Sequence, residues 1–142
     1  MPAMFQGASK VNVKVLDWDT SVVTDMSAML QGATGFNGTI SDWDRVGVTT
    51  MSTLFQGASK CNIEVLDWDT TVVTDMSYMF FETSEFNGNI SGWDIAGVTD
   101  IFVMFQGVTE FNCYPLGWDT AVVRDMSAMF QGATKFNGYI SS

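Results

Sequence analysis

The chain has 142 residues, 46% of them hydrophobic and 13% aromatic, so it can bury the core of one domain and is not expected to be disordered. Its 16 acidic and 6 basic residues give a net charge of −10, and it has no histidine; this argues against binding nucleic acid and favours a protein partner, including a cationic one. No apolar run approaches the roughly 20 residues of a membrane span, so we expect no direct membrane span.

One pattern returns every 25 residues, and it is clearest in the stretch VTDMSYMF that begins at Val73. The residues equivalent to Met76 are Met1, Met26, Met51, Ile101 and Met126. Self-similarity at such a period is typical of stacked repeats. We therefore predict a single repeat domain over 1–142, an α/β solenoid of about six coils at 1–25, 26–50, 51–75, 76–100, 101–125 and 126–142, the last one partial.

Each coil opens with apolar residues at i, i+3 and i+4, such as Met26, Met29 and Leu30, behind a polar residue such as Asp25. This spacing predicts a short helix with its apolar side, including the methionines, in the core. A glycine such as Gly32 follows in five coils, where such a helix would end; Glu82 is the exception.

An asparagine recurs in every coil, at Asn12, Asn37, Asn62, Asn87, Asn112 and Asn137. Stacked asparagines can satisfy the backbone groups of neighbouring coils, so we expect an internal hydrogen-bonded ladder. The alternative is a row of amides that binds a ligand.

The next segment carries a tryptophan in five coils: Trp18, Trp43, Trp68, Trp93 and Trp118. Flanking β-branched residues and leucines predict a short parallel strand, with the indole pointing inward and its two neighbours outward. Odd coils also carry large residues such as Leu66 and Val72 where even coils carry Ser91 and Gly97. We expect these large and small side chains to interdigitate in the core.

Aspartates flank the tryptophans, and eight of them would share the strand face: Asp17, Asp19, Asp42, Asp44, Asp67, Asp69, Asp94 and Asp119. The favoured interpretation is that the aspartate after each tryptophan caps the following turn with its own carboxylate. The alternative is a cation ladder, in which Ca²⁺ bridges neighbouring coils through these oxygens. No other cofactor or metal site is predicted.

The two cysteines, Cys61 and Cys113, occupy positions that are apolar in other coils. They lie two coils apart, which at about 4.8 Å per coil separates their Cα atoms by about 10 Å, beyond the limit of roughly 7 Å for a disulfide. We expect two buried thiols without a disulfide.

Four residues of the fourth and fifth coils break the repeat with large apolar side chains: Tyr78, Phe81, Phe102 and Val103. Phe81 replaces a glutamine and Phe102 replaces a serine of other coils. Positions that are polar elsewhere should face solvent, so these residues are candidates for partner binding. The alternative is that local repacking buries them.

Catalytic chemistry finds no support in this sequence. There is no histidine, and neither a phosphate-binding loop nor a metal-ligand spacing is present. The repeated aspartates would have similar surroundings, whereas acid–base catalysis needs carboxylates with separated pKa values. We expect that the protein is not an enzyme.

The pattern VTDMSxMFxGAxxFNxxISxWD closely resembles the 25-residue repeat of BspA-like surface proteins, over essentially the whole chain. The resemblance implies a right-handed, leucine-rich-repeat-like solenoid with strands on one face and short helices on the other. It also implies roles in surface attachment, adhesion and protein binding at the cell surface or outside the cell, and it offers no catalytic residues.

Two hypotheses about function follow. The first is a non-catalytic repeat scaffold that mediates protein binding or adhesion, as a fragment of a larger surface protein. The alternative is a structural subunit docked inside a larger multi-protein assembly. The chain starts and stops in register without terminal caps, so we expect neighbouring repeats or subunits at its ends.

Overall fold

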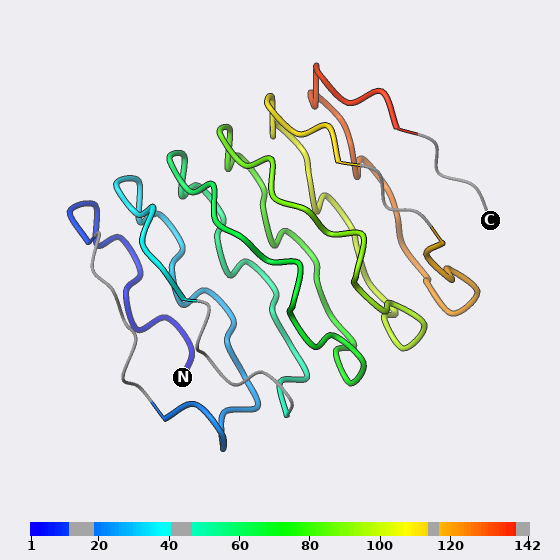
Figure 1. Ribbon diagram of the computed structural model, residues 1–142, viewed down its shortest axis with the longest axis horizontal. Helices are drawn as coiled ribbons and strands as arrows, with labels where there is room; N and C mark the ends of the chain where they lie inside the picture. Colours follow the sequence, from blue (N-terminus) through cyan, green and yellow to red (C-terminus); the bar gives the residue numbers. More distant parts are fainter. Residues whose placement is uncertain (12–18, 41–46, 114–116, 139–142) are drawn as a thin grey trace.

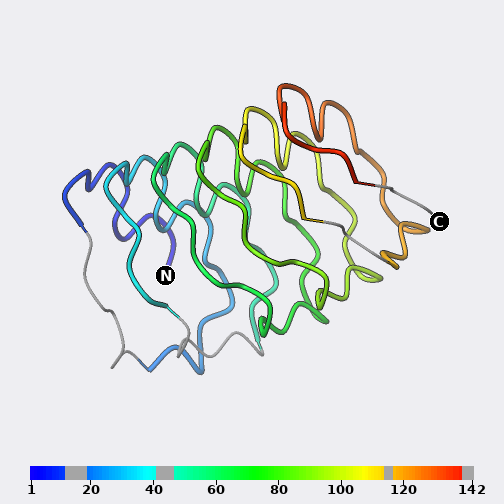
Figure 2. The same ribbon diagram turned by 45° about the horizontal axis from the view of Figure 1, so that its top comes forward.

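The computed structural model describes residues 1–11, 19–40, 47–113 and 117–138. Within these ranges the chain contains no α-helix and no extended strand; it consists of turns and irregular segments held by long-range contacts. Successive coils lie side by side, with the first and last coils at opposite ends of the molecule (Figures 1 and 2). Isolated parallel β-bridges join equivalent residues of neighbouring coils: Asp25 with Thr50, Thr50 with Asp75, Asp75 with Asp100, and Asp100 with Asp125.

In the apolar segment that opens each coil, alternate backbone N–H groups donate to carbonyls of the adjacent layer, and those between them donate to carbonyls of the same segment. In the fourth coil, the N–H group of Met76 donates to the carbonyl of Asp100 at the end of the same coil, and those of Tyr78 and Phe80 donate to the carbonyls of Phe102 and Met104 in the fifth coil, each at 3.0 Å. The intervening N–H groups of Met79 and Phe81 donate to the carbonyls of Met76 and Tyr78, at 3.2 and 3.1 Å. Every second N–H group of this segment therefore joins two coils, and the others close turns.

The short helices predicted at the apolar triplets are wrong. Ala28 has a φ of 55° and Gly32 a φ of 68°, whereas every residue of an α-helix needs a φ near −63°. A left-handed residue at the third position of a β-turn gives a type II turn. The segment is thus a series of turns, and bonds to the next coil satisfy N–H groups that a helix would have paired internally.

The three described tryptophans point inward as predicted, although the described residues around them form no strand. Trp68, Trp93 and Trp118 are 4–5% exposed, and the indole N–H of Trp93 donates to the Val65 carbonyl at 2.7 Å. The neighbouring Asp67 is exposed. The predictions for Trp18 and Trp43 lie outside the described residues.

Stacked aromatic rings form the centre of the core. The phenylalanines of one column, Phe55, Phe80, Phe105 and Phe130, have ring centroids 5.4 to 5.6 Å apart and nearly parallel planes. A second column contains Phe86, Phe111 and Phe136, spaced 6.1 and 5.8 Å apart. Within one coil, the rings of Phe80 and Phe86 are 3.9 Å apart. Full burial of each such ring contributes about 2–3 kcal/mol to folding.

The prediction of interdigitating large and small residues is wrong for the odd-coil positions that the structure describes. Leu66 is 39% exposed and Val72 is 45% exposed, so both contact solvent. The methionine prediction holds in the interior coils, where Met26, Met51 and Met76 are buried. It fails for Met4 and Met126 of the first and last coils, which are 52% and 46% exposed.

Neither cysteine forms a disulfide, in agreement with the repeat register. Cys61 is buried, and burial raises the pKa of its thiol to about 12. Cys113 is only partly buried, so the prediction of a buried thiol is wrong at that position.

Candidate functional site

The aromatic residues that break the repeat come together in a single cluster. The rings of Tyr78 and Phe102 are 5.1 Å apart and those of Tyr78 and Phe81 are 5.8 Å apart, both in edge-to-face geometry. All three side chains are half-buried. We call these three residues the aromatic cluster; edge-to-face pairs of this kind are worth about 0.5–1.5 kcal/mol each beyond burial.

Val103, the fourth candidate, does not belong to the aromatic cluster. Its side chain is 4% exposed, so it lies in the core and cannot offer contact area to a partner. Val103 and Tyr78 occupy equivalent positions in neighbouring coils, and both have a left-handed φ, of 59° and 56°. The local backbone is therefore the same in the two coils, and only the burial of the side chain differs.

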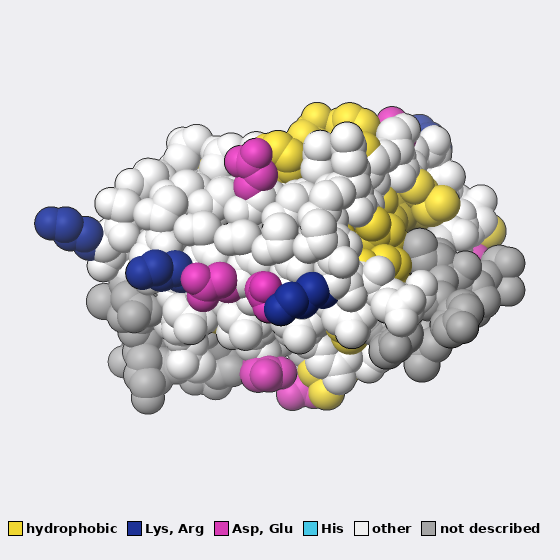
Figure 3. Space-filling view, turned by 90° about the horizontal axis from the view of Figure 1, so that it is seen from above, with side chains coloured by type: hydrophobic (Ala, Val, Ile, Leu, Met, Phe, Trp, Pro, Cys, Tyr) yellow, Lys and Arg dark blue, Asp and Glu magenta, His cyan; other side chains and the backbone are white. Residues whose placement is uncertain are grey.

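The coil-to-coil backbone holds the aromatic cluster in place. Tyr78 donates its N–H to the Phe102 carbonyl, while Phe102 donates its N–H to the Asp100 carboxylate at 3.1 Å. The Phe81 carbonyl accepts from the N–H of Gly57 at 2.7 Å. In the view of Figure 3, hydrophobic side chains gather on the half of the visible face nearer the C-terminal end.

A glutamine ladder runs through the coils on both sides of the Phe81 position, and sequence reasoning missed it. The Gln6 amide donates to Gln31, Gln31 donates to Gln56, and Gln106 donates to Gln131. Phe81 stands at the equivalent position of the fourth coil and separates the two parts of this ladder. Five glutamines at intervals of 25 or 50 residues were the available signal.

The aspartates that follow the tryptophans fold back on their own turns, as the favoured interpretation predicted. Asp19 and Asp69 each accept from the backbone N–H two residues ahead at 3.0 Å, and Asp94 and Asp119 do so at 2.9 and 3.0 Å. The Ser21 hydroxyl, followed by its backbone N–H, lowers the pKa of Asp19; Thr71 acts in the same way on the pKa of Asp69. These carboxylates are thus engaged as turn acceptors.

The cation ladder has less structural support than the turns. Among the described residues, no three carboxylate, cysteine or histidine side chains come together in a group that could hold a metal ion. Asp67 is exposed, and Asp17, Asp42 and Asp44 lie outside the described residues.

The asparagine ladder forms, but on the surface. The side-chain oxygens of Asn37, Asn62, Asn87 and Asn112 each accept from the backbone N–H of the next asparagine at 2.8 to 3.0 Å. These side chains are exposed, so the prediction of an internal position is wrong, and Asn12 lies outside the described residues. The side chains of the ladder bond to the backbone of the next coil. This supports a structural role better than the alternative of a row of amides that binds a ligand.

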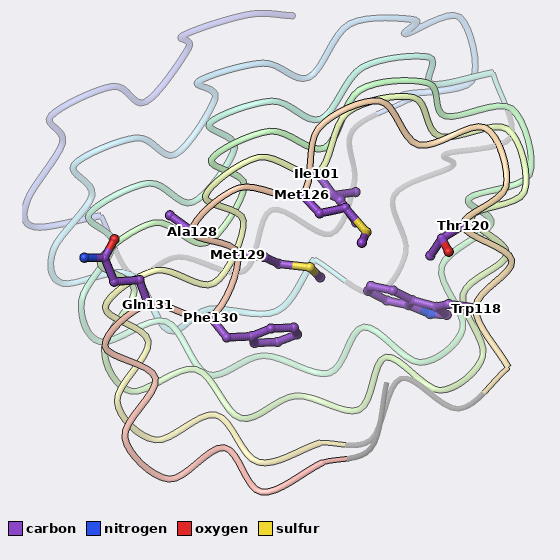
Figure 4. A pocket seen from close by; sticks show the side chains of 8 residues that line it. All are labelled: Ile101, Trp118, Thr120, Met126, Ala128, Met129, Phe130 and Gln131. Carbon is purple, nitrogen blue, oxygen red and sulfur yellow. The ribbon is translucent and has the colours of Figure 1, made fainter. Parts of the chain in front are cut away.

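An apolar cavity of about 310 Å³ opens on the last described coil. Figure 4 shows Met126, Met129, Phe130 and Trp118 pointing into the same hollow. Trp118 and the repeat methionines were predicted as core residues and not as the lining of a cavity. These apolar side chains line an open cavity because no described coil covers them.

Within the described ranges, no helix has the length and apolar character required to cross a membrane. No curated protein and no solved structure matches the chain. One family model does match, twice, over residues 1–70 and 60–142, and these two matches together span the chain. The chain therefore belongs to the family described as "Mycoplasma protein of unknown function, DUF285".

Proposed function

We propose that this chain is a non-catalytic repeat scaffold that binds a protein partner through the aromatic cluster of Tyr78, Phe81 and Phe102. The observation that carries the proposal is that three aromatic side chains contact one another at the surface, at positions that are small or polar in most other coils. Exposed aromatic residues that cluster in this way are enriched among the residues that dominate binding energy.

The charge of the chain favours a cationic partner. Its net charge of −10 attracts basic proteins over a distance, and Glu82 is an exposed carboxylate next to Phe81 in the sequence. Aromatic rings also bind Lys and Arg side chains favourably. We therefore infer a partner surface with apolar residues at its centre and basic residues around them.

The finer family assignment belongs to the same proposal. The stacked 25-residue coils and their parallel bridges support a relation to BspA-like repeats and, through them, to leucine-rich repeats, with turns in place of helices. Such a relation favours a role in adhesion or attachment at a surface, as part of a larger protein.

The test restores the residues that other coils carry, with the double variant Phe81→Gln and Phe102→Ser. Because the double variant loses both edge-to-face pairs and the half-buried area of two rings, the free energy of unfolding should fall by about 1–3 kcal/mol. Binding to a partner isolated with the wild-type chain should weaken at least tenfold. The matched control, Val72→Ser, removes an apolar side chain that is 45% exposed and lies outside the cluster, and it should bind normally.

A loss of more than about 5 kcal/mol in the double variant would show that the cluster belongs to the core and would contradict the proposal. Equal binding by the double variant and the wild type would contradict it as well. Measuring unfolding and binding on the same samples separates these two results.

A further inference from the structure

The glutamine ladder has a gap in the interior of the chain, at the fourth coil. Gln31 shows what a middle member of the ladder does: its side-chain oxygen accepts from Gln6, and its side-chain nitrogen donates to Gln56. A carboxamide makes both bonds at once because it carries a donor and an acceptor. Phe81 stands at the next position of the ladder, and its phenyl ring can make neither bond.

The glutamines on either side of Phe81 are each left with one open bonding group. Gln56 accepts from Gln31, but no described residue accepts from the side-chain nitrogen of Gln56. Gln106 donates to Gln131 at 3.2 Å, but no described residue donates to the side-chain oxygen of Gln106. Both Gln56 and Gln106 are half-buried. A hydrogen-bond donor and an acceptor thus lie on opposite sides of the same gap.

The gap is confined to the side chains, because the backbone continues through it. The Gly57 N–H donates to the Phe81 carbonyl at 2.7 Å, and the Glu82 N–H donates to the Gln106 carbonyl at 2.9 Å. The Gly32 N–H makes the equivalent bond one coil earlier, also at 2.7 Å. The coils therefore keep their spacing of about 4.8 Å at this point, and the gap has the width of one ladder residue.

We propose that the partner of the aromatic cluster fills this gap with the side-chain carboxamide of a glutamine, the residue that fills it in the five other coils. The incoming oxygen accepts from Gln56, the incoming nitrogen donates to Gln106, and Phe81 supplies the apolar surface beneath. This inference rests on the proposed function, because it names the group that the same surface receives. Since water can bond to both glutamines when the surface is free, these bonds select among partners more than they add affinity.

The charge around the gap favours a glutamine with basic neighbours. Glu82 is exposed, and its side chain lies toward the fifth coil, since a Cβ at Gly107 would be 3.5 Å from Glu82 Cγ. The chain as a whole carries a net charge of −10. Lysines on either side of the incoming glutamine therefore complement this surface.

The test uses two peptides that differ in one residue. Both have the sequence acetyl-Lys-Gly-X-Gly-Lys-amide, in which X is glutamine or methionine; methionine has a similar length and no carboxamide. Binding to the 142-residue chain is followed by NMR, on the backbone amide of Phe81 and the side-chain amides of Gln56 and Gln106. The glutamine peptide should bind about tenfold more tightly than the methionine peptide, which leaves both open groups unpaired.

Single substitutions assign this preference to the gap. Gln56→Met removes the donor and Gln106→Met removes the acceptor, so each should lower the preference for the glutamine peptide to about threefold. Phe81→Gln closes the gap with a carboxamide of the chain itself and should abolish the preference, whereas Phe81→Leu leaves the gap open and should keep it. The matched control is Gln6→Met, which changes a ladder glutamine at neither side of the gap and should keep the full preference.

Equal affinity of the wild type for the two peptides overturns the inference. So does a preference that survives both Gln56→Met and Gln106→Met, or one that Gln6→Met lowers to the same extent. The absence of any change in the spectrum at about 10 mM glutamine peptide overturns it as well. The proposed function is tested separately, by the Phe81→Gln and Phe102→Ser double variant and its isolated partner. If that variant loses the partner while the wild type does not distinguish the peptides, the inference alone is wrong.

Discussion

Left-handed residues at two positions of each coil determine its backbone. One position is glycine in five coils and Glu82 in the fourth, with φ between 57° and 77°. The other is occupied by side-chain-bearing residues throughout, from Ala3 and Ala28 to Val103 and Ala128. A left-handed conformation costs a residue with a Cβ roughly 1–2 kcal/mol relative to glycine, so these positions store strain that the coil-to-coil hydrogen bonds must offset.

Glu82→Gly should stabilise the protein. Glycine adopts the φ of 57° without strain, and part of this gain is lost because glycine is more flexible in the unfolded chain. We expect the free energy of unfolding to rise by about 0.5–1 kcal/mol in urea denaturation.

The reverse change, Gly57→Ala, provides the control for Glu82→Gly. A Cβ at Gly57 would approach only the Gly32 backbone, at an ordinary 3.9 Å, so any loss comes from its φ of 69° and not from a clash. It should destabilise the protein by about 1 kcal/mol. If Glu82→Gly and Gly57→Ala changed the free energy of unfolding in the same direction, the left-handed conformation at this position would not limit stability.

At the scale of the coil, side-chain ladders add to the backbone bonds. The asparagine ladder is directional: Asn62, Asn87 and Asn112 each donate a backbone N–H to the preceding coil and accept with the side chain from the following coil. Removing a side chain in the middle therefore leaves one backbone N–H of the next coil without its partner.

Asn87→Ala should destabilise the protein by about 1 kcal/mol, because the N–H of Asn112 loses its acceptor. Asn137→Ala is the matched control. Within the described residues the Asn137 side chain accepts from no later coil, so its removal should change stability by less than about 0.5 kcal/mol. Thermal melts of both variants check this, and equal losses would argue against a directional ladder.

The repeat period alone predicted much of the coil. It placed the tryptophans inside, paired the asparagines and separated the two cysteines. The spacing of Met26, Met29 and Leu30 could not distinguish a helix from a series of turns, because both bury residues with that spacing. The sign of φ at Ala28 decided the outcome, and alanine gives no sequence signal for a left-handed conformation.

Only part of the candidate site was predicted correctly: three of its four residues form the cluster. Tyr78, Phe81 and Phe102 were found because they break a polar pattern, and the structure brings their rings together. Val103 breaks the pattern as well, at the position equivalent to Tyr78 and with the same left-handed φ, but its side chain is buried, and the repeat pattern carries no signal for that difference. The cavity on the last coil could be found only from the structure and not from the sequence.

At the scale of the whole molecule, the coils act as one stacked array. Aromatic columns, side-chain ladders and alternate backbone bonds all run in the same direction, perpendicular to the path of each coil. Each coil contacts mainly its neighbours, so stability should build up through nearest-neighbour contacts.

The central claim is that backbone N–H groups bond from one coil to the next and not along a helix. NMR detection of scalar couplings across hydrogen bonds tests it directly. We expect correlations from the amide nitrogen of Met76 to the carbonyl carbon of Asp100, and from the amide nitrogen of Phe80 to the carbonyl carbon of Met104. A correlation from the Phe80 amide to the Met76 carbonyl, four residues earlier as in an α-helix, would contradict it.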